Sequence, residues 1–142
     1  MIRNAIILYS IIAAAAVVLL IPYLRGQHKK IRRYQNRCTR KTTGTFEEYR
    51  YCGSEKHPRV CGVRFAYRAP DGEIVKPVFP IQSKPFRRGD TLEFWFDPGN
   101  YYFVCTDSMI KRLKHDMIFT VLMAAVWLAA GLVILLNYLH LY

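Results

Sequence analysis

Four cysteines and one histidine in the middle of the chain are the side chains best suited to covalent or metal chemistry. The cysteines are Cys38, Cys52, Cys61 and Cys105. In an oxidising compartment four cysteines predict two disulfides with three possible connectivities, whereas in a reducing cytosol they would be small buried hydrophobic side chains. A zinc site that includes His57 is a third interpretation, although the chain contains no C-x-x-C pair. Cys52 and Cys61 are expected to flank a hairpin loop and could face one another across it, so the redox state stays open.

Acid–base or nucleophilic catalysis is not indicated by the remaining polar residues. The chain has no Gly-rich phosphate loop, no ordered set of serine, histidine and aspartate, and no ionisable side chain within its two most apolar stretches. Turn formation explains the aspartates, and positions near a membrane interface explain the scattered histidines. These residues are Asp71, Asp90, Asp97, His28, His115 and His140. We therefore predict a protein that is not an enzyme and has no catalytic, cofactor-binding or metal-binding residues.

Two apolar stretches, one near each end of the chain, must position everything between them. Residues 5–24 and 117–136 are each twenty residues long and carry no charge. At about 1.5 Å per residue, a helix of that length covers roughly 30 Å, the thickness of a bilayer hydrocarbon core. Neither stretch has the polar side that a helix of a soluble protein would show. We therefore predict two transmembrane helices, and the apolar length of the first argues against a cleaved signal peptide.

The charges next to the two stretches predict which side of the membrane the middle of the chain faces. Residues 25–41 contain eight basic side chains and no acidic one, and three more precede the second stretch at residues 111–114. On the opposite ends only Arg3 carries a fixed charge. By the positive-inside rule the central domain is cytoplasmic and both termini lie outside, in a bacterial inner (plasma) membrane. An exported central domain is the rival orientation, because the loop exceeds the roughly 60 residues over which the rule holds.

The same basic residues are the candidate binding site. Lys and Arg side chains next to a membrane are attracted to anionic lipid headgroups by about 1 kcal/mol each. The alternative is a solvated, helix-extending run of charge that only sets the topology. Nucleic-acid binding is not predicted, because aromatic residues that could stack on bases are limited to Tyr34 in this segment. The predicted lipid-headgroup contacts are Arg25, Lys29, Lys30, Arg32, Arg33, Arg37, Lys111, Arg112 and Lys114.

Small residues in both apolar stretches predict close contact between helices. Ala13 and Ala16 in the first stretch, and Ala125 and Ala129 in the second, are spaced so that helix backbones can approach one another. The simplest interpretation is a hairpin in which the two helices pair. Contact with another membrane protein, or with a second copy of the chain, is the alternative.

The residues between the helices have the pattern of short β-strands separated by turns. Phe65 and Tyr67 fall on one face of their strand, and P-D-G at residues 70–72 and D-P-G-N at residues 97–100 predict tight turns. We expect a membrane α+β protein, in which two transmembrane helices flank a small five-stranded antiparallel sheet or partly open barrel. The five predicted strands cover residues 42–51, 60–68, 73–79, 91–97 and 101–105.

These elements divide the chain into six segments. They are the first transmembrane helix with a short outer N-terminus, a basic juxtamembrane segment, the β-rich domain, a basic connector, the second transmembrane helix and a short outer C-terminal tail. In order, their bounds are residues 1–24, 25–41, 42–107, 108–116, 117–136 and 137–142.

Two strand-and-turn sequences carry a resemblance to a known family. They are V-R-F-A-Y-R-A-P-D-G-E-I-V at residues 63–75 and F-R-R-G-D-T-L-E-F-W-F-D-P-G-N at residues 86–100. With a helix on each side, this layout resembles the two-span bacterial membrane family known as domain of unknown function 3592. The basic residues 25–41 and the cysteine-bearing loop at residues 52–61 depart from that family's pattern. The resemblance implies the architecture and brings no activity, catalytic residue or cofactor.

The predicted function follows from this architecture. We expect a non-enzymatic integral membrane protein whose membrane-tethered β-domain is a protein-interaction or assembly module, accessory or regulatory to a membrane complex. Its partners would be membrane lipid and either another membrane protein or a homo-oligomer, with no cofactor and no nucleic acid. One alternative is a membrane-resident immunity protein that protects against an envelope-acting toxin. Another is a module that senses anionic lipid through residues 25–41.

Overall fold

The computed structural model describes residues 2–80 and 85–140, which form two compact units. One unit combines Met1–Ile31 with Lys111–Tyr142, and the other is Arg32–Ile110. Three parts of the predicted segments fall outside the described residues, namely residue 1 of the first segment, residues 81–84 of the loop before the fourth predicted strand, and residues 141–142 of the tail.

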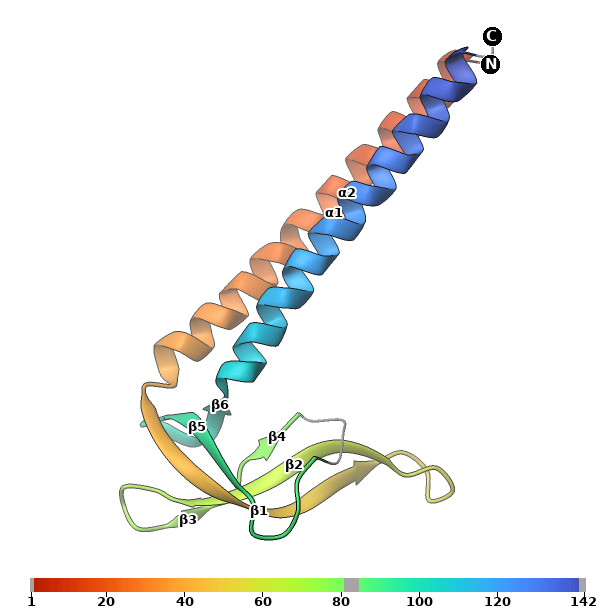
Figure 1. The fold of residues 1–142 in the computed structure, drawn as a ribbon. Coiled ribbons are helices and arrows are strands. Elements are labelled where there is room, and N and C mark those ends of the chain that lie inside the picture. Colours follow the sequence, from red (N-terminus) through yellow and green to blue (C-terminus); the bar gives the residue numbers. More distant parts are fainter. Residues whose placement is uncertain (1, 81–84, 141–142) are drawn as a thin grey trace. The chain divides into compact units, whose positions relative to one another are not determined.

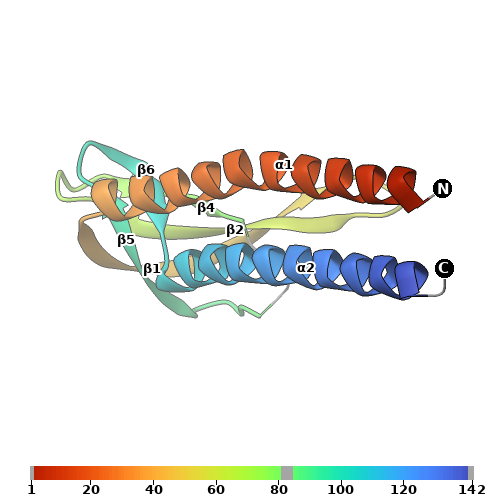
Figure 2. The ribbon, with the colours of Figure 1, turned by 90° about the horizontal axis from the view of Figure 1, so that it is seen from above.

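Two long helices account for the first unit. Helix α1 (Ile2–Arg37) runs without a break through Pro22, and helix α2 (Asp107–His140) follows the last strand. They lie side by side and antiparallel in two perpendicular views (Figures 1 and 2). Both are long and apolar enough to cross a membrane, and none of the residues in their most apolar windows is buried within the protein. Helix α1 continues into the basic segment predicted at residues 25–41 and ends at Arg37.

A narrow seam of half-buried residues marks where the two helices meet. The Tyr9 hydroxyl donates a hydrogen bond to the Leu128 carbonyl oxygen at 2.6 Å. The Tyr9 ring also fills the space beside Gly131, where an added Cβ would lie 2.7 Å from Tyr9 Cε2. The other half-buried residues follow the three-and-four spacing of a helix face. They include Ala5, Ala13, Ala16, Leu20 and Leu24 on α1, and Leu113, Met117, Thr120, Ala124 and Leu135 on α2.

On α2, the alanine that lies in the seam is not one of the two that were predicted to lie there. Ala13 and Ala16 lie in the seam, but Ala125 and Ala129 are exposed and the helix turns Ala124 inward. The difference is one residue, or about 100° of rotation around the helix axis. Small residues surround this position on several sides of α2, so the sequence pattern could not decide which of them face α1.

The second unit is an open antiparallel sheet. The strand order is β3-β2-β1-β5-β6, and β4 also pairs with β2. The predicted five strands become six because the predicted strand 73–79 is divided at the buried Pro77, which has no N–H to donate to a ladder. The strands are β1 (Arg40–Cys52), β2 (Arg59–Arg68), β3 (Ile74–Val75), β4 (Val78–Phe79), β5 (Thr91–Asp97) and β6 (Asn100–Cys105).

Strand β1 joins the two halves of the sheet. Its first half pairs with β5 and its second half with β2, and Thr45 has a partner on both sides. Gly44, next to this crossing, is buried, and a Cβ added there would lie 2.7 Å from the Phe94 ring and 3.2 Å from the Ala66 carbonyl oxygen. The close approach of β5 to β1 therefore requires glycine at this position.

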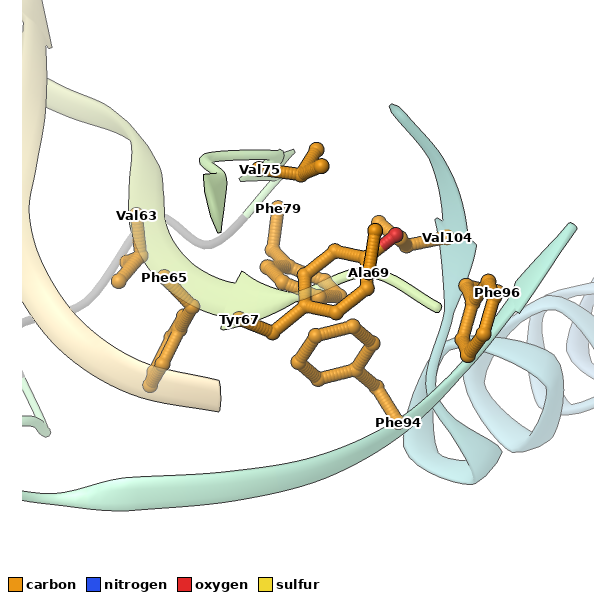
Figure 3. Close-up of a cluster of buried hydrophobic side chains, with 9 residues drawn as sticks. All are labelled: Val63, Phe65, Tyr67, Ala69, Val75, Phe79, Phe94, Phe96 and Val104. Atoms are coloured by element: carbon orange, nitrogen blue, oxygen red, sulfur yellow. The ribbon is translucent and has the colours of Figure 1, made fainter. Parts of the chain in front are cut away.

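The core lies where β2, β4 and β5 bring aromatic rings together (Figure 3). Phe94 meets Tyr67 and Phe79 edge-on, with ring centroids 5.2 Å and 5.0 Å apart. Phe65 and Phe79 have the same arrangement at 5.6 Å. The predicted placement of Phe65 and Tyr67 on one face of their strand is confirmed, since both rings are buried. Full burial of such a ring stabilises the fold by about 1.5–3 kcal/mol.

Substitution of Gly44 by alanine tests the packing at the point where β1 passes from its pairing with β5 to its pairing with β2. The added methyl group collides with Phe94, and overpacking of this kind costs about 1–3 kcal/mol. We expect the melting temperature of the β-domain to fall by at least about 4 °C, measured by near-UV circular dichroism of the full chain in a mild detergent. Gly26→Ala is the matched control, because nothing lies within 4 Å of that site, and it should leave the transition unchanged. An unchanged transition in Gly44→Ala would contradict this packing.

Candidate functional site

The helical segment after the first apolar stretch turns its basic residues outward. Leu24 and Gln27 are half-buried and Ile31 is buried, so these three positions form the inward face of the segment. The basic side chains between them occupy the other faces and are exposed. They are Arg25, Lys29 and Lys30.

The start of α2 adds three more exposed basic residues at the same level. Because both helices rise about 1.5 Å per residue, the step from Tyr9 to Arg25 along α1 has the same length as the step from Leu128 back to Arg112 along α2. Arg25 and Arg112 therefore lie at the same level, at one end of the apolar pair. We call the six residues the basic collar: Arg25, Lys29, Lys30, Lys111, Arg112 and Lys114.

Thr106 caps the first turn of α2, and the collar residues of that helix follow in the next turn. Its hydroxyl oxygen accepts a hydrogen bond from the Met109 N–H at 3.2 Å and lies 2.8 Å from the Ser108 hydroxyl. A threonine in this position satisfies one of the free N–H groups at the helix start. Thr106 is therefore the N-cap residue of α2, which begins at Asp107.

Arg37 differs from the other predicted headgroup contacts because it has a partner within the β-domain. Its Nε and one terminal nitrogen donate to Asp97 Oδ2 at 2.8 Å and 2.7 Å. The guanidinium carbon also lies 4.3 Å from the centre of the Phe103 ring, and that of Arg33 lies 5.4 Å from it. Arg37 therefore connects the end of α1 to β5 and β6, while Arg32 and Arg33 remain exposed.

Asp97 has both carboxylate oxygens engaged. Oδ2 accepts from Arg37, and Oδ1 accepts the Gly99 N–H at 2.8 Å in the turn between β5 and β6. The Gly99 N–H and the Arg37 guanidinium hold the pKa of this carboxyl below its ordinary value of 3.8. Asp97 therefore has two roles. It forms the predicted D-P-G-N turn, and its carboxylate also binds Arg37 at the end of α1.

Phe103 on β6 is the residue that the sequence interpretation missed. Tyr34 stacks on it with ring centroids 5.2 Å apart and planes at 17°, and Arg37 covers it as well. Tyr34 and Arg37 are three residues apart, which places both on one face of α1. That spacing was available in the sequence, but nothing local pointed to a strand more than sixty residues later as its partner.

A shallow hollow of about 360 Å³ opens beside the first half of β1. Its lining includes three basic residues, Arg40, Lys41 and Arg68, together with Phe96. Lys41 is paired there with Glu93 at 3.0 Å. The hollow is open to solvent and its cations are exposed, so it does not enclose a ligand in the way that substrate pockets do.

No protein-family model matches this chain, and no match was found among curated proteins or among solved structures. The resemblance to the two-span family carried by residues 63–75 and 86–100 therefore stays a prediction.

Substitution of Asp97 by asparagine tests the contact between α1 and the sheet through its pH dependence. A carboxyl whose pKa is depressed in the folded state contributes stability above its ordinary pKa of 3.8 and loses that contribution as the pH falls through the lower folded value. We expect Asp97→Asn to melt several degrees below the unaltered chain at pH 7, and the difference to shrink below about pH 4. Thermal unfolding in a non-ionic detergent measures it.

Glu93→Gln serves as the control for this experiment. It removes a carboxylate from an exposed pair with Lys41, a kind of contact that contributes only about 0–1 kcal/mol. Its melting temperature should follow that of the unaltered chain at both pH values. A difference between Asp97→Asn and the unaltered chain that persists at pH 3 would show that the ion pair is not its cause.

Proposed function

We propose that this chain is a two-span integral membrane protein whose β-domain is a non-enzymatic protein-interaction or assembly module, held next to the bilayer as an accessory or regulatory part of a membrane complex. The observation that carries the proposal is the combination of an apolar helix pair, exposed on every side except its seam, with an open sheet. Each of these surfaces requires a different partner, lipid for the first and protein for the second.

Lipid is the partner that fits the helix pair. Large apolar side chains point away from the seam, and Trp127 is 73% exposed while Ile134 is 70% exposed. In water this surface would be an aggregation site, whereas in a bilayer it is solvated and the helical hydrogen bonds satisfy the backbone. The basic collar lies at one end of the pair, and by the positive-inside rule it supports a cytoplasmic β-domain with the opposite helix ends outside.

The outer edge of β6 is the part of the sheet best suited to a protein partner. No strand among residues 2–80 and 85–140 pairs with this edge, because β6 is the last strand in the sheet order. Tyr102 projects from it with 68% of its surface exposed. The Tyr101 and Phe103 carbonyl oxygens of β6 already accept hydrogen bonds, from the Tyr67 hydroxyl and the Cys38 thiol. The exposed Tyr102 ring is therefore the feature that we expect a partner to bind, because tyrosine is a common anchor in protein interfaces.

Cross-linking in cells followed by purification of the full chain from carbonate-washed membranes tests this proposal. We expect a defined cross-linked species, either a second copy or another membrane protein, to be recovered in gentle detergent. Tyr102→Lys puts a charge on the edge and removes the aromatic anchor, so it should reduce that species at least about fivefold. Thr43→Lys is the matched control, since Thr43 is exposed on the central strand β1, and it should have no effect.

Two results would contradict the proposal. Recovery of the folded, monodisperse chain in the aqueous fraction after the carbonate wash would show that the helix pair is not solvated by lipid. Recovery of the uncross-linked monomer alone from membranes would show that the β-domain has no partner there.

Anionic-lipid binding by the basic collar is a second candidate function. The specific observation in its favour is that the six collar residues are exposed and that residues from α1 and α2 reach the same level of the helix pair. A ring of charge at the end of a lipid-facing surface lies where headgroup phosphates would be. Each basic side chain near such a surface contributes about 1 kcal/mol.

Removal of four collar charges tests this second function. We expect the amount of anionic phospholipid that co-purifies with the chain in mild detergent, measured by mass spectrometry, to fall at least about fivefold. The variant carries glutamine in place of Arg25, Lys29, Lys30 and Arg112. The control carries the same number of changes on exposed residues of the β-domain, namely Lys56, Arg59, Arg87 and Arg88. Equal lipid retention by the two variants would contradict a role specific to the collar.

A further inference from the structure

The contact between the end of α1 and β6 brings two distant cysteines together. Tyr34 and Arg37 both pack on the Phe103 ring, and Cys38 follows Arg37 directly. The Cys38 Sγ lies 3.7 Å from the Phe103 carbonyl oxygen. Cys105 is two residues after Phe103, so its side chain is on the same face of the strand. Cys105 is the neighbour with the largest influence on the Cys38 thiol, so the two side chains lie close to one another, with Cys38 6% exposed and Cys105 1% exposed.

We propose that Cys38 and Cys105 form a dithiol site that a disulfide-bearing oxidant closes into a disulfide, joining the residue that follows α1 to the last residue of β6. Both residues are free thiols in this structure. This bond would connect the entry and the exit of the β-domain, since the next helix, α2, begins at Asp107. The inference does not depend on the proposed function, because it concerns a contact within the β-domain alone.

The reaction is two successive thiol–disulfide exchanges. In the first, one of the two protein thiolates attacks one sulfur of the oxidant's disulfide, so that a mixed disulfide forms and the other oxidant sulfur leaves as a thiolate. In the second, the other protein thiol loses its proton and its sulfur attacks the protein sulfur of the mixed disulfide, which releases the remaining oxidant sulfur as a thiolate. The protein pair loses two protons and two electrons, and the oxidant's disulfide is reduced to two thiols.

The two thiols have different environments in the folded protein. The interaction with Cys38 lowers the pKa of the Cys105 thiol, because it stabilises the thiolate. The same interaction, together with burial, raises the pKa of Cys38, although the nearby Arg37 acts in the opposite direction. Because both are buried, exchange requires the domain to open or to be oxidised while it folds.

The remaining two cysteines form a second pair with a different environment. In the β1–β2 hairpin the register shifts between Arg50 and Tyr51, so that Cys61 is the extra residue of a bulge. Its Sγ lies 3.6 Å from the Arg50 carbonyl oxygen, and Cys61 is the neighbour with the largest influence on the thiol of Cys52, whose pKa it raises. Cys52 is exposed and Cys61 half-buried. Of the three connectivities that four cysteines allow, the fold thus brings one into contact, and the exposed pair is an internal standard for the buried one.

Redox titration of the full chain in detergent tests the proposal. The protein is equilibrated with mixtures of oxidised and reduced glutathione at a temperature just below its melting transition, free thiols are alkylated, and peptides are analysed by mass spectrometry without reduction. We expect a peptide that links Cys38 to Cys105, which disappears on addition of dithiothreitol. Oxidation should raise the melting temperature of the β-domain by at least about 5 °C, because the bond closes a long loop of the unfolded chain.

Two variants separate the buried pair from the exposed one. Cys38→Ser should abolish both the linked peptide and the rise in melting temperature on oxidation, whereas Cys52→Ser should retain both. Formation of the Cys52–Cys61 link without any Cys38–Cys105 link, or links that join one pair to the other, would overturn the proposal. So would an unchanged melting temperature once the Cys38–Cys105 link has formed.

Discussion

Two helices that are apolar on nearly every face must be shielded from water, and the rest of the molecule depends on this constraint. The seam between α1 and α2 shelters only one side of each helix, and the remaining side chains of both have no protein covering them. Their surroundings must therefore be apolar, and a lipid bilayer is the environment that we propose. The charged side chains of the two helices then lie towards the ends of the pair, and the basic collar lies at one of these ends.

The basic residues that look alike in the sequence have two different roles in the structure. Those of the collar are exposed and available to a negatively charged surface. Arg37, by contrast, is engaged by Asp97 and Phe103. An arginine is suited to this position because its planar fork can bond a carboxylate and lie over a ring at the same time. The end of α1 is thereby held against β5 and β6, and this same contact brings Cys38 to Cys105.

The sheet was largely predictable because its signals are local. Alternation placed Phe65, Tyr67 and Phe94 on buried faces, and the turns at residues 70–72 and 97–100 follow from proline, aspartate and glycine. The strand that Pro77 divides was predicted as one, since a two-residue interruption hardly alters the hydrophobic pattern. The requirement for glycine at position 44 was not predictable, because it depends on how closely Phe94 on another strand approaches.

The amino-acid sequence by itself determined the length, apolarity and position of the two helices, the charge beside them and the β character of the middle, because each of these is a property of consecutive residues. Only the tertiary structure decided that α2 turns Ala124 rather than Ala125 towards α1, that Arg37 meets Asp97, and which cysteines are neighbours. These outcomes join residues far apart in the chain. A helix that is apolar all round, or a cysteine with three possible partners, carries no local signal that could choose among them.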